Sequence, residues 1–373
     1  MNVGVLTSSR ADFGIYLPLL RRLQQTPHVT LKIFAFGTHL SPFYGQTVQE
    51  IERNGFEVAE NIETVLAHDT ASAVTLSMAL TMQQFATVWQ KHAASLDVVL
   101  ALGDRYEMFA AVAASAPFNI PIAHLHGGET TLGAIDNRFR HAITQFATLH
   151  FASTKAYADK IVQMIGHSDG VYHVGSLSLD NLQDMDLLSP EAFLERYGID
   201  LRIPTILTTF HPETVRAEGN VYYAEQIVKA LDALSATHQI LLTMPNADTA
   251  GTVIRKAVSS LSARNSNVFA VESLGVLGYF SAMRHCAFLL GNTSSGIIEA
   301  ASLGKYVVNV GDRQKGRAQS ANILDCAFKA EAITATAERA IQNGAYTGGN
   351  LYQAPEGLAS DLILKQLLRF AAH

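Results

Sequence analysis

The chain contains little charge, little cysteine and a single tryptophan. Charged residues make up 16% of its 373 residues, and the formal net charge is -6. Such a chain is not a general binder of nucleic acid or of anionic membrane surfaces, so any anionic ligand must be held by a local group of cations. The two cysteines, Cys286 and Cys326, lie in apolar stretches and are too few for a disulfide framework or a cysteine metal cluster.

Several familiar signals are also missing. No apolar run approaches the roughly 20 residues of a membrane-spanning helix, and MNVGVLTSS enters a strand-like segment without a basic leader. We therefore expect a cytoplasmic protein whose partners include neither a membrane nor nucleic acid. The chain has no G-x-G-x-x-G after its first predicted strand, no G-x-x-x-x-G-K-[ST], no G-x-S-x-G and no H-E-x-x-H. Arg105 separates Asp104 from Glu107, which weakens a metal site there, so we expect no metal.

Short apolar runs alternate with helical patterns along the whole chain, which is typical of parallel α/β architecture. The length suggests two domains. The predicted buried strands form two series, at 2–8, 31–36, 97–102, 120–125, 149–153 and 171–175, and then at 205–210, 238–244, 267–271, 286–290 and 306–311. The prediction is α/β, with two doubly wound Rossmann-like domains facing a cleft.

The boundary between the two series is predicted in residues 177–204, which lack a strong strand and include the polar stretch SLDNLQDMDLLSP. We therefore expect an N-terminal Rossmann-like domain at 1–176 and a C-terminal one at 177–355. A last helix, at 356–373, is expected to pack back on the first domain.

Polar residues follow almost every predicted strand, where ligands of doubly wound sheets bind. The first half supplies acids and histidines, namely Asp104, Glu107, His126, Glu129, Asp136 and His141. Cations and small polar residues make up the other group, namely Arg10, His211, Ser294, Ser295, Arg313 and Arg317. This division suits a reaction in which a nucleoside diphosphate leaves while acid–base groups act on the attached sugar.

The stretch GNTSSGIIEAASLG, residues 291–304, is the clearest candidate for an anion site. A strand, a turn of small residues and a helix start leave backbone N–H groups without internal partners. Ser294, Ser295 and Gly296 add hydroxyls and room for close approach. Glu299 lies one helical turn beyond Ser295, where it could accept from a ribose diol. The simpler alternative is an ordinary N-cap followed by a solvated glutamate.

Other candidates also have structural explanations. Asp104 could simply cap the helix that begins near Arg105, and His141 could be a packing residue. Arg138 and Arg140 could pair with nearby acids on a helix surface. His211 is harder to explain in this way, because a His-Pro pair directly after a buried strand directs the imidazole into the cleft.

Taken together, SRADFG, GDRYE, HGGE with a downstream D-x-x-x-R-H, HPET, GNTSSGIIEA and GDRQKGR resemble the hydrolysing UDP-N-acetylglucosamine 2-epimerases of the bacterial sialic-acid and legionaminic-acid pathways. The motifs occur in order over about residues 1–320. The resemblance implies a glycosyltransferase-B-like fold, no cofactor, a UDP-sugar substrate, a UDP product and a homo-oligomer. It also implies elimination of UDP to 2-acetamidoglucal, followed by hydration to N-acetylmannosamine.

The resemblance also implies the roles of individual residues. The catalytic candidates are Asp104, Glu129, Asp136 and His211, with no assignment of acid and base. The substrate-binding candidates are Arg10, Arg105, Glu107, Asn246, Ser294, Ser295, Gly296, Glu299 and Arg313.

Several alternatives stay open from the sequence. Some relatives have an acidic residue where this chain has His126, which leaves UDP-N,N′-diacetylbacillosamine as a possible substrate in place of UDP-N-acetylglucosamine. A UDP-sugar glycosyltransferase, a non-catalytic UDP-sugar binding protein and a non-hydrolysing epimerase also remain. The number of subunits and any allosteric regulation are not predicted.

Overall fold

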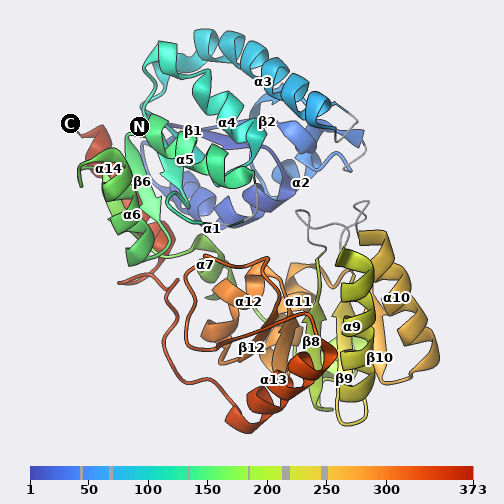
Figure 1. Cartoon of the computed structure of the whole chain (residues 1–373). Helices are drawn as coiled ribbons and strands as arrows, with labels where there is room; N and C mark the ends of the chain where they lie inside the picture. Colours follow the sequence, from blue (N-terminus) through green and yellow to red (C-terminus); the bar gives the residue numbers. More distant parts are fainter. Residues whose placement is uncertain are drawn as a thin grey trace. The chain divides into compact units, whose positions relative to one another are not determined.

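The computed structural model describes residues 1–42, 45–66, 70–130, 132, 135–183, 185–211, 219–244 and 251–372, apart from the side chains of 220, 251 and 252. The chain divides into two compact units. Unit 1 comprises 1–130, 135–181 and 352–373, and unit 2 comprises 131–134 and 182–351. Each unit is a parallel sheet with helices on both faces (Figure 1).

Unit 1 contains a parallel sheet of seven strands in the order β3-β2-β1-β4-β5-β6-β7. The strands are β1 (Asn2–Thr7), β2 (Thr30–Phe36), β3 (Val58–Ile62), β4 (Val98–Leu102), β5 (Ile122–Leu125), β6 (Leu149–Ala152) and β7 (Val171–His173). Its helices are α1 (Arg10–Gln25), α2 (Val48–Arg53), α3 (Ala71–His92), α4 (Tyr106–Ala113), α5 (Asp136–Phe146), α6 (Lys155–Ile165) and α14 (Ala359–Ala371), with 3-10 turns η1 (Gly37–Leu40), η3 (Ala93–Ser95) and η4 (Ala116–Phe118).

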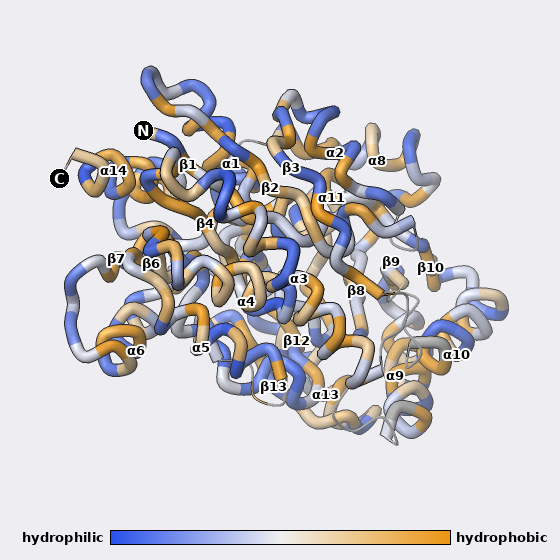
Figure 2. The backbone as a smooth tube through the Cα atoms, turned by 90° about the horizontal axis from the view of Figure 1, so that it is seen from above, coloured by the Kyte–Doolittle hydropathy of each residue, from blue (hydrophilic) through white to orange (hydrophobic). Residues whose placement is uncertain are grey.

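The core of unit 1 has two layers, one on each face of the sheet. Alternate residues of β2 enter different layers: Ile33 packs with α1 and α14, whereas Phe34 packs with α3. Because both faces are covered, the central strands are apolar almost throughout, as the hydropathy colouring of β4 shows in Figure 2.

Unit 2 repeats this plan with six parallel strands in the order β10-β9-β8-β11-β12-β13. The strands are β8 (Thr205–Thr209), β9 (Gln239–Thr243), β10 (Val268–Val271), β11 (Phe288–Gly291), β12 (Val307–Val310) and β13 (Ile323–Cys326). The helices are α8 (Pro190–Tyr197), α9 (Asn220–Leu234), α10 (Gly251–Arg264), α11 (Gly275–His285), α12 (Ser294–Ile298) and α13 (Ala330–Asn343), with η6 (Ala300–Leu303) after α12. Helix α7 (Leu177–Gln183) crosses from unit 1 into unit 2.

The main boundary between the units lies between residues 181 and 182, a few residues later than the predicted 176–177. The difference arises because Leu177 packs in the core of unit 1 and the Asn181 amide donates to the Gly14 carbonyl at 2.8 Å. The chain returns to unit 1 at residue 352, where the sequence analysis placed the return at 356. Asp180 then accepts from the backbone N–H groups of Ala359 and Ser360, which fixes the start of α14 beside α1 (Figure 1).

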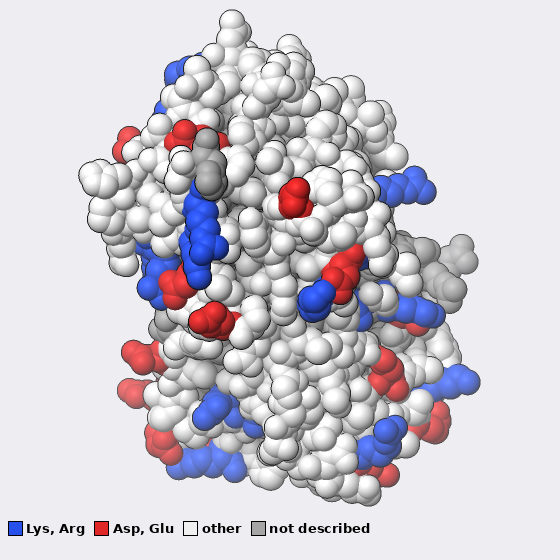
Figure 3. All heavy atoms as spheres, turned by 90° about the vertical axis from the view of Figure 1, so that its left-hand side faces the viewer, with Lys and Arg blue, Asp and Glu red and all other residues white. Residues whose placement is uncertain are grey.

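The surface carries few charges. On the face drawn in Figure 3, acidic and basic side chains are interspersed and separated by wide uncharged areas. No helix in the described part of the chain is long and apolar enough to span a membrane.

Candidate functional site

An acid cluster lies in unit 1 after strands β4 and β5. Arg140, a buried residue of α5, forms an ion pair with Asp104, which directly follows β4 and its turn. The Arg140 Nη1 atom also lies 3.2 Å from Glu129 Oε2 and donates to the His126 carbonyl at 2.9 Å. Burial alone would lower the pKa of Arg140, but the charges of Glu129 and Asp104 raise it above its usual value. One guanidinium therefore holds two of the predicted catalytic carboxylates together.

Glu129 is the most enclosed of these carboxylates. Its Oε1 atom lies 2.7 Å from His126 Nδ1 and accepts from the Ser153 hydroxyl at 2.8 Å. With Arg140 on Oε2, both carboxylate oxygens have partners and the side chain is 3% exposed. These contacts give Glu129 a single orientation.

Asp136 is the first residue of α5 and is partly buried. Burial and, to a smaller extent, the charge of Asp104 raise its pKa above the usual value for aspartate. A carboxyl group with a raised pKa retains a proton more readily, which suits a general acid. The structure thus brings Asp104, Glu129 and Asp136 together around Arg140, in different environments.

Arg105 and Glu107 support this cluster. Arg105 donates to Glu107 Oε1 at 2.7 Å, and the Glu107 side chain is fully buried. Glu107 Oε2 has no hydrogen-bond partner among the described residues. This arrangement fits the role of positioning the start of α4 better than direct contact with a ligand.

Backbone contacts fix the two turns that carry these residues, the turn at Gly103 after β4 and the HGGE turn after β5. His124 of β5 is fully buried, with its Nε2 atom 2.9 Å from the carbonyl of Gly103. Burial lowers the pKa of His124 to about 3, so the ring is neutral and its Nε2–H donates to that carbonyl. Gly128 has φ +74°, and a Cβ there would lie 2.6 Å from the Tyr157 carbonyl oxygen. The HGGE turn therefore requires glycine at this position.

Arg10 also belongs to unit 1. It begins α1 next to the N-cap Ser9, its side chain is 72% exposed, and its closest acidic partner is Glu50 at 3.9 Å. The preceding turn is held by Asp12, whose buried carboxylate accepts from backbone and hydroxyl groups of Ser8 and Ser9. Arg10 thus extends into solvent from a firmly held turn.

In unit 2, Asn292 organises the turn after β11. Its side chain accepts from the His211 backbone N–H at 2.7 Å and donates to the His211 carbonyl at 2.9 Å. The Asn292 carbonyl accepts from Arg313 at 3.1 Å and from Gln314 at 2.8 Å. Burial and the Arg313 charge lower the pKa of His211 to about 4. The structure thus brings His211 and Arg313 together through Asn292, a residue that the sequence analysis did not include among the candidates.

The 291–304 stretch forms a strand end, a tight turn and a short helix. Gly291 has φ +149°, and a Cβ there would lie 1.9 Å from the Thr209 carbonyl oxygen, so no larger residue fits. Thr293 caps α12, and Ser294 and Ser295 follow as its first, partly exposed residues. Gly296 and Glu299 are buried. The glutamate is therefore not the solvated residue of the simpler alternative.

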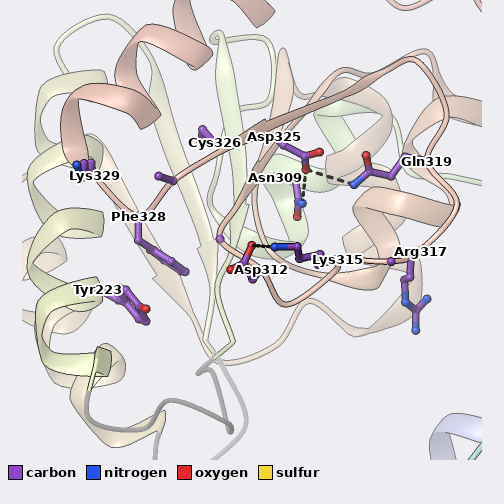
Figure 4. Close-up of a pocket in the computed structure, with 13 residues that line it drawn as sticks. Tyr223, Asn309, Asp312, Lys315, Arg317, Gln319, Asp325, Cys326, Phe328 and Lys329 are labelled. Atoms are coloured by element: carbon purple, nitrogen blue, oxygen red, sulfur yellow. Dashed lines mark hydrogen bonds and ion pairs between the residues drawn. The ribbon is translucent and has the colours of Figure 1, made fainter. Parts of the chain in front are cut away.

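A pocket of about 580 Å³ lies beside the 311–317 loop (Figure 4). The rings of Tyr223 and Phe328 stack at 4.2 Å on one side of it. Asp325, on the far side, accepts from Asn309 and Gln319. Arg313 is not among the described residues that line this pocket.

Some predictions lie outside what the structure describes, and some features were missed. Asn246 lies outside the described residues. For Arg140 the sequence analysis offered only an ion pair on a helix surface, but the residue is 3% exposed and pairs with buried acids. The signal was present in D-x-x-x-R-H, because Arg140 is one turn after Asp136. Among the described residues, no group of three His, Cys, Asp or Glu could hold a metal ion.

Comparisons with known proteins show the family of the chain. The family model described as UDP-N-acetylglucosamine 2-epimerase matches residues 21–367. The hydrolysing UDP-N,N′-diacetylbacillosamine 2-epimerase of Legionella pneumophila is 33% identical over 93% of this chain and 90% of its own length. The polysialic acid biosynthesis protein P7 of Escherichia coli is 31% identical, over 88% and 83%.

The fold has close counterparts among solved structures. The UDP-GlcNAc 2-epimerase from Neisseria meningitidis, solved bound to UDP-GlcNAc, superposes with a TM-score of 0.79 at 18% identity, over 99% of this chain and 100% of that one. The family-model match over residues 21–367 and the two relatives that are more than 30% identical confirm the family that the ordered sequence motifs predicted. The chain belongs to the UDP-N-acetylglucosamine 2-epimerase family.

Proposed function

We propose that this protein converts UDP-N-acetylglucosamine and water into N-acetylmannosamine and free UDP, for the synthesis of sialic-type nonulosonic acids. The observation that carries this proposal is the set of three carboxyl groups around the buried Arg140 in unit 1. A protein that only bound or transferred a UDP-sugar would not need such a group. The two relatives, named for hydrolysing epimerisation and polysialic acid synthesis, support the same reaction class.

The reaction would proceed in two steps. First, a base removes the C2 proton while the C1–O bond to the diphosphate breaks, which leaves 2-acetamidoglucal and UDP. Water then adds at C1, and a proton is delivered to C2 on the opposite face, which gives the epimer. The C2 proton is weakly acidic, so much of the barrier must fall through stabilisation of the departing diphosphate.

The residues of unit 1 would handle the proton transfers. Asp104, Glu129 and Asp136 are the acid–base candidates, and the raised pKa of Asp136 favours it as a proton donor. Arg105 and Glu107 would hold this group in place.

Residues of unit 2 would hold UDP. Arg10, in unit 1, is a separate candidate for substrate binding. Arg313 and His211 would face the diphosphate, together with Ser294, Ser295 and Gly296. His211 is neutral at pH 7 in the free protein, because its pKa is about 4, and an arriving diphosphate would favour its protonated form. Glu299 would accept from the ribose hydroxyls. We also propose that the protein is cytoplasmic. We further propose that it forms a homo-oligomer, and light scattering of the purified protein would test this oligomeric state.

The second candidate is the same reaction on UDP-N,N′-diacetylbacillosamine. The Legionella relative that carries this name supports it. The two candidates share the chemistry at C1 and C2 and differ only in the sugar's substituents.

The test is incubation of the protein with each UDP-sugar in deuterated water, without added metal, followed by proton NMR. Free UDP and a C2-deuterated 2-epimer from UDP-N-acetylglucosamine are expected. Turnover of the diacetylbacillosamine nucleotide alone would favour the second candidate. A UDP-linked epimer without free UDP would refute hydrolysis, and UDP release only with an added acceptor would indicate a transferase.

A further inference from the structure

The environment of Glu129 makes it a poor direct partner for a substrate. Its Oε1 atom is shared by His126 Nδ1 and the Ser153 hydroxyl, and its Oε2 atom lies against Arg140. A carboxylate with donors on both oxygens and 3% of its side chain exposed has little capacity left to meet a sugar.

His126 has the complementary properties. Its side chain is 12% exposed, and Nε2 makes no hydrogen bond among the described residues. A carboxylate only accepts hydrogen bonds, so Nδ1 must carry the hydrogen that joins His126 to Glu129. In the neutral ring, the lone pair is then on Nε2, the atom left available. The pair therefore has the arrangement of a base oriented by a carboxylate.

The backbone of His126 is held in an uncommon conformation. Its φ is +62°, in the left-handed region that residues other than glycine rarely adopt. The His126 N–H donates to Phe151 at 3.1 Å, and the His126 carbonyl accepts from Arg140 at 2.9 Å. These contacts maintain the strained turn, and such strain is concentrated at functional positions.

We infer that His126 Nε2 is the base that takes the C2 proton in the elimination step, and that Glu129 is its positioning residue. The Nε2 lone pair forms the new N–H bond as the C2–H electrons form the C1=C2 bond. The C1–O bond breaks, and UDP leaves with its electron pair. The resulting imidazolium is stabilised by Glu129, and its proton is later lost to water. This inference rests on the proposed function.

The first test uses variants that tolerate the backbone. His126→Gly and His126→Asn both accept a positive φ, and the glycine variant leaves room for added imidazole. A matched control is His28→Gly, because His28 also has a positive φ, of +63°, but is exposed and belongs to no site described above. We expect His126→Gly to lose about 10²–10⁴-fold in kcat with UDP binding retained, and to recover activity with imidazole. The control should keep wild-type kcat.

The second test separates the two half-reactions. Hydration of added 2-acetamidoglucal removes no proton from C2, so His126→Asn should retain it while losing UDP release from the UDP-sugar. Glu129→Gln should lower kcat without weakening UDP binding. Because residues that act as a unit are non-additive, adding Glu129→Gln to His126→Gly should cost little more than His126→Gly alone.

The possible outcomes distinguish a failure of the inference about His126 from a failure of the proposed function. Wild-type UDP release by His126→Asn would overturn the inference while leaving the proposed function intact. So would a His126→Gly variant that imidazole does not rescue, or a double variant whose loss is the product of the two single losses. A wild-type protein that turns over neither UDP-sugar would instead refute the proposed function, and the inference with it.

Discussion

Replacing Arg140 by methionine should destabilise unit 1 more than any other single change at the acid cluster. Arg140 is 3% exposed, and its guanidinium is the cation that contacts both Glu129, at 3.2 Å, and Asp104. At an effective dielectric constant of about 20, attraction at that distance is on the order of 5 kcal/mol for Glu129 before desolvation is subtracted. Methionine retains most of the apolar length but leaves two carboxylates without their counter-charge.

The expected loss is about 3–5 kcal/mol, the usual consequence of removing one partner of a buried ion pair. Asp104 is 25% exposed, so water should compensate part of its charge and keep the loss within this range. For a unit of about 200 residues, the loss corresponds to a melting temperature roughly 10 °C lower.

Differential scanning calorimetry at pH 7.5 measures the loss. Arg138→Met is the matched control, because Arg138 lies on the same helix but is exposed. A double variant with Glu129→Gln should recover part of the loss, since one uncompensated charge is then absent. If Arg140→Met melts together with the control at pH 7.5, the argument that one buried guanidinium holds the cluster together is wrong.

Three further predictions follow from the described residues. Gly291→Ala should lower the unfolding free energy of unit 2 by on the order of 3 kcal/mol in urea and abolish UDP binding, because the new Cβ would lie 1.9 Å from a carbonyl oxygen. The control is Gly349→Ala, which should cost little because a Cβ there meets nothing within 4 Å. His211 has a folded-state pKa of about 4, below its usual 6.5. Between pH 6.5 and pH 4 the unfolded chain therefore binds more protons than the folded chain does. Stability should therefore fall by up to about 3 kcal/mol as pH drops through this window, a dependence that His211→Asn should remove. The Asp136 carboxyl should titrate above the usual aspartate range in carbon-13 NMR, because burial and a neighbouring carboxylate raise its pKa; a normal titration would contradict its proposed role as an acid.

The apolar strands were predictable from the sequence, whereas two of the edge strands were not. Residues 97–102 form a continuous apolar run, and the structure places β4 in the middle of the first sheet. Strands β3 and β13 were not predicted. Both are edge strands with half-exposed, partly charged sequences such as VAENI, so they lack the pattern of strands buried on both faces.

Sequence alone determined the family, the α/β architecture and the chemical inventory of the site, because ordered motifs and apolar periodicity are local properties of the chain. Tertiary structure decided which groups work together. Arg140 appears on a helix beside other polar residues, and only folding buries it between Asp104 and Glu129. Likewise, no spacing rule indicates that the Glu129 carboxylate contacts the His126 ring. The partner of a charge depends on which strands end side by side and on how much water the packing excludes, and neither quantity is encoded in local sequence.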